Sequence, residues 1–297
     1  MRKHIILISA VAGLVAAQRN PSQPLSPAQA MANELFRKAV GTPEQMNTAF
    51  PPYKVIGNVY YVGPESLGSY LITTPEGHIL INSDFERTVP IIRESVEKLG
   101  FKFTDIKILL GSHAHGDHMQ GDAMVKEMTG AKVMVMEEDV VELMKMTPGG
   151  KPHPLDRILH DGDQVKLGGM TLTAHLTPGH SKGCTTWTFP VQDGGKTYQV
   201  LILGSVGVNP GFVLVNNKDY PQIESDYRHS FEVLRATHYD VFLASHPAFY
   251  NMTEKYAKLG KGGPNPFIDP DGVKAHVAEE EKVLNAVVAE QKAAAAH

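Results

Sequence analysis

Short apolar runs, separated by Gly and Pro, dominate the chain from Tyr53 onward, and this pattern predicts strands joined by turns. The runs are rich in β-branched and aromatic residues, which suit a pleated and half-buried surface. The expected strands lie within KVIGNVYYVG, SYLITT, HILINSD, IKILLGS, AKVMVM, QVKLGGMTLTAHL, TTWTF, YQVLILGS and DVFLASH.

Helices are expected between these strands. They cover Val89–Leu99 (ending at Gly100), a short stretch before Gly130, the segment EEDVVELMKM, Ile223–Ala236 and about Asp271–Ala295. Strand-rich blocks therefore alternate with helices in two successive portions of the chain, which indicates a layered α/β architecture. Residues 147–154, TPGGKPHP, are expected to form a loop, with His153 as a solvated loop histidine.

A further helix is expected near the N-terminus. Ser26 has the character of an N-cap, Pro27 suits the first helical position, and Gly41 suits the stop. The bulky apolar side chains of this helix would share one face: Met31, Leu35 and Phe36. We therefore expect the helix to pack on the body of the protein.

The first 17 residues have the pattern of a secretory signal peptide. Arg2 and Lys3 precede an apolar run, and small residues allow cleavage after Ala17. The run is shorter than the roughly 20 residues of a membrane-spanning helix, and no later segment resembles one, so no membrane span is expected after cleavage. We expect export to the periplasm, an N-terminal arm with a short helix over 18–52, and a single domain over 53–297.

Composition excludes some classes of function. The formal net charge is −4 and the basic residues are scattered, which argues against a nucleic-acid partner. The single cysteine, Cys184, cannot form an internal disulfide and is expected to be a small buried residue.

The segment LLGSHAHGDHMQGD concentrates ionisable side chains directly after an apolar strand. His113 and His115 are two residues apart, so both can face one metal ion, while Asp117 and His118 can turn toward a second. Imidazole and carboxylate groups suit Zn²⁺, and catalytic zinc sites keep one position open for water. A solvated, histidine-rich surface turn is the alternative interpretation.

Four ligands cannot complete two such sites, so further histidines are expected at other strand ends. His180 follows a strand and a Pro-Gly turn in HLTPGH, and His246 ends an apolar strand in DVFLASH. Active sites of layered α/β proteins gather at such ends.

These residues resemble the metallo-β-lactamase superfamily, whose signature is His-x-His-x-Asp-His. The resemblance covers almost the whole mature chain and is greatest for the third subclass of zinc β-lactamases, subclass B3. The segments that carry it are TPGHSKGCTTWTF, GSVGVNPG, ESDYRHSFEVLRA and ASHPAFY. It implies an αββα sandwich of two pseudo-symmetric halves, with a two-zinc site between the sheets at one edge.

The resemblance also implies ligands and chemistry. Each of two Zn²⁺ ions per chain takes three ligands: the first His113, His115 and His180, and the second Asp117, His118 and His246. The implied reaction is hydrolysis of the β-lactam amide bond of carbapenems, cephalosporins and penicillins. A zinc-bound hydroxide would attack without a covalent intermediate, with Asp117 as the catalytic residue beside it.

Several positions distinguish subfamilies. Ser205 stands where thioesterases of the superfamily have a metal-bridging aspartate, and a serine here marks subclass B3. Ser205 is expected to bind substrate, because a hydroxyl is a poor zinc ligand. Gly207 replaces a second serine that binds substrate in some relatives, and Asn209 is expected to compensate for it. Asn82 replaces an aspartate found in many relatives, with Asp84 two residues on, and the lost charge is expected to weaken zinc binding.

Two alternatives remain open from the sequence. One is another two-zinc hydrolase of the same fold, a lactonase or thioesterase, and the other is a non-catalytic zinc-binding protein. Ser205 and the export signal favour the lactamase, and the complete ligand set argues against the non-catalytic protein. The expected partner is a small-molecule β-lactam, and the expected state is a monomer.

Overall fold

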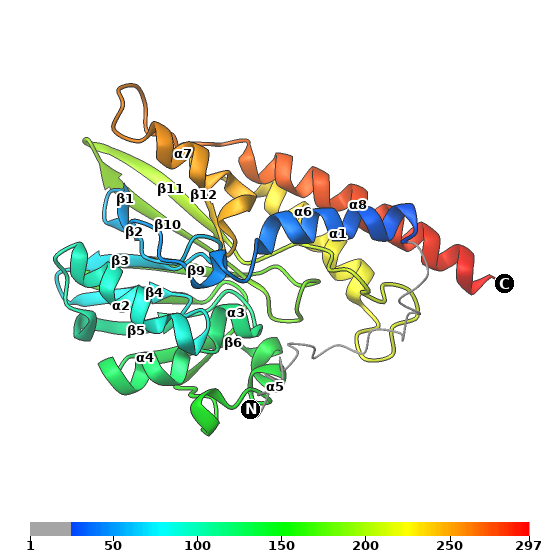
Figure 1. The fold of residues 1–297 in the computed structure, drawn as a ribbon, viewed down its shortest axis with the longest axis horizontal. Helices are drawn as coiled ribbons and strands as arrows, with labels where there is room; N and C mark the ends of the chain where they lie inside the picture. The colour runs from blue at the N-terminus through cyan, green and yellow to red at the C-terminus, as the bar shows by residue number, and fades with distance from the viewer. Residues whose placement is uncertain (1–24, 297) are drawn as a thin grey trace, which may run out of the picture.

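The computed structural model describes residues 25–296 (Figure 1). The predicted signal peptide and its cleavage after Ala17 lie outside these residues. Two sheets pack face to face, and each comes from one contiguous portion of the chain. The first sheet contains β1 (Tyr53–Ile56), β2 (Val59–Tyr61), β3 (Tyr70–Thr74), β4 (Gly77–Ile81), β5 (Ile106–Leu110), β6 (Lys132–Met136) and β7 (Arg157–Leu159). The second contains β8 (Gln164–Leu167), β9 (Met170–Leu176), β10 (Thr185–Asp193), β11 (Lys196–Leu203) and β12 (Val241–Ala244).

Both sheets are mixed, with antiparallel and parallel strand pairs. The first sheet follows chain order, antiparallel from β1 to β4 and parallel from β4 to β7. The second has the order β12-β11-β10-β9-β8, and only its β11–β12 pair is parallel within the described strands. The loops that follow the parallel strands β4, β5, β11 and β12 therefore begin at the carboxyl ends of these strands. The sites of α/β proteins form at such ends.

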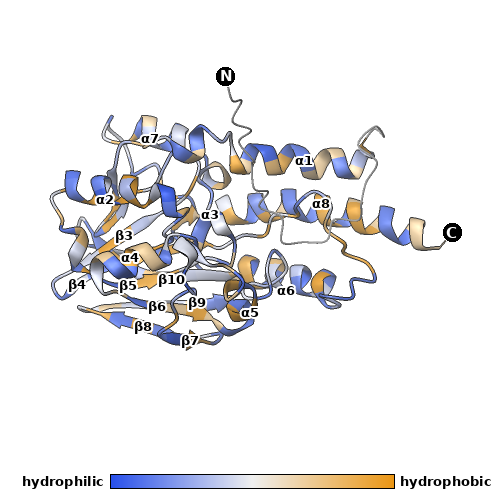
Figure 2. Cartoon of the chain, turned by 60° about the horizontal axis from the view of Figure 1, so that its bottom comes forward, coloured by the Kyte–Doolittle hydropathy of each residue, from blue (hydrophilic) through white to orange (hydrophobic). Residues whose placement is uncertain are grey.

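Helices cover the outer faces of both sheets. Within residues 25–296 they are α1 (Pro27–Val40), α2 (Val89–Lys98), α3 (Gly116–Met119), α4 (Asp122–Thr129), α5 (Val140–Leu143), α6 (Ile223–Ala236), α7 (Met252–Lys258) and α8 (Gly272–Ala295). In β4, Ile79 and Ile81 face the second sheet, whereas Leu80 packs with α2 on the outer face. Strands with two buried faces form near-continuous apolar runs, which Figure 2 shows as orange strands within the layers. The predicted α/β class and αββα sandwich are confirmed.

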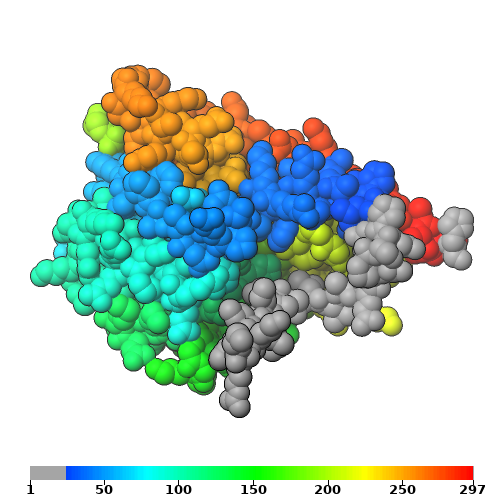
Figure 3. Space-filling view, viewed as in Figure 1, coloured from blue at the N-terminus to red at the C-terminus, as the bar shows by residue number. Residues whose placement is uncertain are grey.

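The N-terminal helix α1 forms as predicted but buries a different face. The Ser26 hydroxyl accepts a hydrogen bond from Gln29 N at 3.1 Å, and the helix ends at Gly41, whose φ is 69°. The helix lies along α8, and its dark blue atoms lie on the right-hand part of the face seen in Figure 3. Its buried residues are alanines: Ala28, Ala32 and Ala39.

The predicted apolar face of α1 was therefore wrong in part. Leu35 packs against the core, but Met31 is 41% exposed. Small side chains let two helix backbones approach closely. The face that α1 buries is therefore the one that fits against α8, and not the one with the bulkiest side chains. The expectation that the helix packs on the body is confirmed.

Two other expectations from the sequence can be compared with the core. Cys184 is fully buried, as predicted, between β9 and β10. None of the helices between residues 25 and 296 is long and apolar enough to span a membrane.

Candidate metal centre

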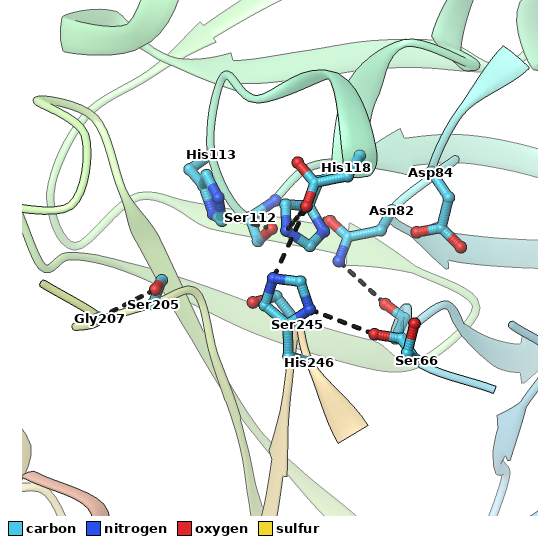
Figure 4. A network of polar contacts seen from close by, with 12 residues as sticks. Ser66, Asn82, Asp84, Ser112, His113, His118, Ser205, Gly207, Ser245 and His246 are labelled. Atoms are coloured by element: carbon cyan, nitrogen blue, oxygen red, sulfur yellow. Dashed lines mark hydrogen bonds and ion pairs between the residues drawn. The ribbon is translucent and has the colours of Figure 1, made fainter. Parts of the chain in front are cut away.

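Three separate segments bring the predicted ligands together. The loop after β5 and the short helix α3 carry four of them, the β9–β10 loop carries His180, and His246 follows β12. Figure 4 labels three of the six ligands, His113, His118 and His246. All six lie at the edge of the sandwich where the parallel strands end. The six residues form two groups of three: His113, His115 and His180, and Asp117, His118 and His246.

In the first group, the possible ligand atoms lie within 4.8 Å of one another. The ring centroid of His113 lies 4.6 Å from those of His115 and His180. His113 and His180 are buried, whereas His115 is partly exposed, so the group opens toward solvent on one side. This is an arrangement that can hold one ion and still admit water.

The second group adjoins the first. Asp117 Oδ2 lies 3.5 Å from His118 Nε2 and 3.7 Å from His246 Nε2. The rings of His113 and His118 have centroids 4.4 Å apart, so the two groups are in contact. The geometry allows two neighbouring ions rather than one.

The donor atoms of these groups fit a metal. His113 Nε2 and both ring nitrogens of His118 are buried without a hydrogen-bond partner among the described residues. Buried polar atoms are rarely left unpaired, since each costs about 1–3 kcal/mol, and a bound cation would satisfy one ring nitrogen of each histidine. Imidazole and carboxylate together are typical zinc ligands.

Backbone carbonyls select the ring nitrogens that face the cluster. His180 Nδ1 lies 2.7 Å from Gly207 O, and His246 Nδ1 lies 3.2 Å from Ser66 O. A carbonyl accepts, so these Nδ1 atoms carry the hydrogen and Nε2 keeps its lone pair. Such contacts orient a ligating histidine and set its tautomer.

Electrostatics keeps the ligands in their metal-binding forms. Burial, reinforced by the neighbouring imidazoles, holds the pKa of His113 and His180 well below the usual value, and burial lowers the pKa of His118 to about 3. Burial alone would raise the pKa of Asp117, but the imidazoles of His118 and His246 lower it overall. At neutral pH these three histidines are therefore neutral imidazoles, and Asp117 is an ionised carboxylate.

Asn82 supports the cluster through its amide. Its Nδ2 donates to Gly68 O at 2.9 Å, and its Oδ1 accepts from Ser112 N at 2.9 Å, directly before His113. A carboxylate could accept from Ser112 but could not donate to Gly68. Burial raises the pKa of Asp84 well above the usual value, and its Oδ2 accepts from the Ser69 hydroxyl at 2.6 Å. The predicted effect of Asn82 on zinc affinity stays a prediction.

Asp139 is a site residue that sequence reasoning missed. Its Oδ2 accepts from Ala114 N and from the Ser181 hydroxyl, both at 2.8 Å, and its Oδ1 accepts from Gly183 N at 2.7 Å. The buried carboxylate thus links the loop of His113 and His115 to the loop of His180 through hydrogen bonds to both. The only signal in the sequence is an acidic residue just before a short helix, which is typical of a solvated helix start.

The expectation that His153 is solvated was wrong. Its side chain is fully buried, with Nε2 3.3 Å from Asp122 Oδ2 and 3.1 Å from Met119 O, while Nδ1 lies 2.9 Å from Pro154 O. Both ring nitrogens face oxygen atoms, an arrangement that favours the imidazolium form, in which both nitrogens donate. Burial opposes this charge, but Asp122 and the two carbonyls raise the pKa of His153 overall. The pair anchors the 147–154 loop beside α3.

Replacing His153 by glutamine is expected to lower the free energy of unfolding by about 2 kcal/mol, because the buried ion-pair partner of Asp122 is lost. A histidine with a raised pKa contributes its full stability below its unfolded pKa and loses it as pH rises through the folded pKa. The loss in the variant should therefore be larger at pH 6 than at pH 9, as measured by urea denaturation. His160→Gln is the control, because that side chain is 62% exposed and its ion pairs are at the surface. Equal effects of the two substitutions would contradict the buried ion pair.

The predicted substrate contacts lie on the loop after β11. Ser205 is almost fully buried, and its Oγ accepts a hydrogen bond from Gly207 N at 3.2 Å. Asn209 is half-buried on the same loop. The Gly207 carbonyl contacts His180, so this loop borders the first group of ligands.

The chain is similar to proteins of a known family. A family model described as the metallo-beta-lactamase superfamily matches residues 62–246. The native FEZ-1 metallo-beta-lactamase from Legionella gormanii is 48% identical, with a TM-score of 0.79, covering 83% of this chain and 98% of that one. BJP-1, a subclass B3 metallo-beta-lactamase of Bradyrhizobium japonicum, is 35% identical, with a TM-score of 0.75, covering 84% and 98%.

The chain also matches part of a relative with a different name. The hydroxyacylglutathione hydrolase of Rhodopseudomonas palustris (strain BisB5) is 29% identical over 120 residues, which span 40% of this chain and 42% of that protein. The chain thus matches less than half the length of this relative.

The chain belongs to the metallo-beta-lactamase superfamily. Within the superfamily, the resemblance to subclass B3 expected from the sequence is confirmed.

Proposed function

We propose that the protein is a subclass B3 metallo-β-lactamase that uses two Zn²⁺ ions to hydrolyse the amide bond of β-lactams. The observation that carries this proposal is the pair of adjoining three-residue groups, which supplies a complete set of ligands for two ions. The 48% identity to the Legionella gormanii enzyme, over 98% of its length, supports the substrate class.

The residues divide the work between the two ions. The first ion would be held by His113, His115 and His180, and the second by Asp117, His118 and His246. When bound, zinc lowers the pKa of a water molecule toward about 7 and polarises a carbonyl group, so that attack at neutral pH needs no strong base.

Asp117 is the catalytic residue of this proposal. Its carboxylate stays ionised, and its side chain is 19% exposed, so it can reach a water molecule at the open side of the cluster. It accepts a hydrogen bond from the attacking water and holds the water oxygen toward the lactam carbonyl. Ser205 and Asn209 bind the substrate from the facing loop, where a hydroxyl and an amide can donate to a carboxylate.

Attack by water without a covalent intermediate agrees with where the potential nucleophiles lie. A Ser-x-x-Lys spacing, typical of serine β-lactamases, occurs at Ser95–Lys98. Ser95 is buried on α2, on the outer side of the first sheet, and Lys98 pairs with Glu94 at 2.8 Å. This pair lies away from the ligand groups.

A thioesterase is the second candidate, favoured by the partial likeness to hydroxyacylglutathione hydrolases. The test is to offer the zinc-loaded protein a cephalosporin, a carbapenem, a lactone and a glutathione thioester under the same conditions. We expect kcat/KM for the lactams to exceed that for the thioester at least 100-fold. Preference for the thioester or lactone would overturn the proposed substrate class.

The substrate contacts give a further prediction. Asn209→Ala is expected to raise KM for a β-lactam about tenfold with little change in kcat, because a hydrogen bond to a charged group is worth about 1.5–3 kcal/mol. Steady-state kinetics measures this, with Asn217→Ala as a control, since its amide donates to Val213 O and holds only the loop. An unchanged KM in Asn209→Ala would remove this residue from the substrate site.

The proposal extends to the processing, domain organisation and oligomeric state of the chain. We propose that residues 1–17 are a signal peptide, that residues 53–297 form a single domain, and that the mature protein is a periplasmic monomer. The proposal is supported by the signal-peptide pattern of the sequence and by the family model's match within a single span.

A further inference from the structure

The peptide that joins Gly207 to Val208 is held at both of its polar ends. Gly207 O accepts a hydrogen bond from the Tyr227 hydroxyl at 2.7 Å and lies 2.7 Å from His180 Nδ1. Val208 N donates to Glu280 Oε2 at 3.2 Å. The carbonyl and the amide belong to one planar unit, so these contacts fix its rotation about the chain.

The two side chains that hold this peptide come from different helices and are deeply buried. Tyr227 on α6 is fully buried, and Glu280 on α8 is 3% exposed. Glu280 has no ion-pair partner within residues 25–296, and a buried carboxyl without one is costly unless it makes a specific contact. Burial raises the pKa of Glu280 to about 7, and both forms of the carboxyl keep an oxygen that accepts from Val208.

Packing around Gly207 does not hold the peptide by itself. A Cβ added there would meet the Ser205 hydroxyl at 3.5 Å and Glu280 and His180 at 3.9 Å, all ordinary contacts. The loop therefore has room around this residue, and the polar contacts decide how the peptide is turned. Figure 4 shows Gly207 on the loop that faces the ligands, beside Ser205.

The orientation of this peptide matters for His180. With the carbonyl toward the ring, Nδ1 carries the hydrogen and Nε2 keeps a lone pair for the first ion. A rotated peptide would present an N–H instead, which favours the opposite tautomer and removes that lone pair. Contacts behind a ligand typically change metal affinity 10- to 100-fold.

We propose that Tyr227 and Glu280 are positioning residues of the first metal site, because they hold the Gly207–Val208 peptide in the orientation that turns His180 Nε2 toward the ion. This inference rests on the metal site of the proposed function, but not on the identity of the substrate. Neither residue touches the reacting atoms.

The first test measures zinc affinity by competition with a chromophoric chelator. Tyr227→Phe and Glu280→Leu are each expected to weaken the binding of one zinc ion about 10- to 100-fold and to leave the other unchanged. Glu280→Gln is expected to restore wild-type affinity, because its amide oxygen accepts from Val208 N. Tyr239→Phe is the matched control, since it removes a buried hydroxyl that accepts from Val273 N on α8, away from the site.

The second test needs neither zinc nor activity. In the metal-free protein, ¹⁵N NMR of the imidazole groups should report hydrogen on His180 Nδ1 in the wild type and in Glu280→Gln, and a shift toward the Nε2-protonated form in Tyr227→Phe. Wild-type zinc affinity and an unchanged His180 tautomer in both Tyr227→Phe and Glu280→Leu would overturn the proposal. Failure of the wild type to bind two zinc ions would instead refute the proposed function, while the NMR measurement would still test the positioning.

Discussion

Replacing Asp117 by asparagine is expected to lower kcat for a β-lactam about 100- to 10,000-fold, the range found when a group that handles the proton of the attacking nucleophile is lost. The amide is nearly the same size as the carboxylate, so the fold is retained. It carries no negative charge to stabilise a cation between His118 and His246, whose Nε2 atoms lie 3.5 and 3.7 Å from Asp117 Oδ2. Metal content should therefore fall from two zinc ions per chain toward one.

Steady-state kinetics and metal analysis on the same preparation check this expectation. Asp219→Asn is the control, because it makes the same change at an exposed position near the site loops. A loss of activity with two zinc ions still bound would assign Asp117 to catalysis alone. Full activity in Asp117→Asn would contradict its placement in the site.

Removing the Asp139 carboxylate has the second largest expected effect. Asp139→Ala should lower the free energy of unfolding of the metal-free protein by about 4 kcal/mol, because Ala114 N, Gly183 N and the Ser181 hydroxyl lose a buried, charged acceptor. The two ligand loops should also separate, so that zinc binding to the first site weakens. Urea denaturation of the metal-free protein measures the stability change.

Ser181→Ala separates the role of the carboxylate from that of one of its donors. It removes a single hydrogen bond and should cost about 1 kcal/mol. If Asp139→Ala destabilises no more than Ser181→Ala, the carboxylate does not hold the two loops together.

Local pattern was enough to predict four of the six ligands. The spacing of His113, His115, Asp117 and His118 follows from a strand entering a tight loop, and both features can be recognised within a short segment. His180 and His246 stand at strand ends, which converge on one edge of a layered fold, but it was the resemblance to the superfamily that implied their place among the ligands. The structure brings all six residues into two groups.

The supporting residues could not be predicted in the same way, because their roles depend on partners distant in sequence. Glu280 lies in the segment AEEEKV, which is typical of a solvated helix face, and only the approach of the Gly207–Val208 peptide gives it a buried contact. His153 follows the same rule, since its loop appears solvated until Asp122 and Met119 O are placed beside it. Helix α1 was found from its capping residues, but the face it buries was set by α8.

The most direct test of the central claim is carbapenem hydrolysis by the purified mature protein as a function of bound zinc. The protein would be stripped by chelation, titrated with Zn²⁺, and analysed for metal content and turnover at each step, with His118→Ala in parallel. We expect no turnover without metal, recovery that rises to a plateau at two zinc ions per chain, and a much lower plateau in His118→Ala. Two bound zinc ions without lactam turnover, or turnover that survives complete removal of metal, would contradict the proposed two-zinc β-lactamase.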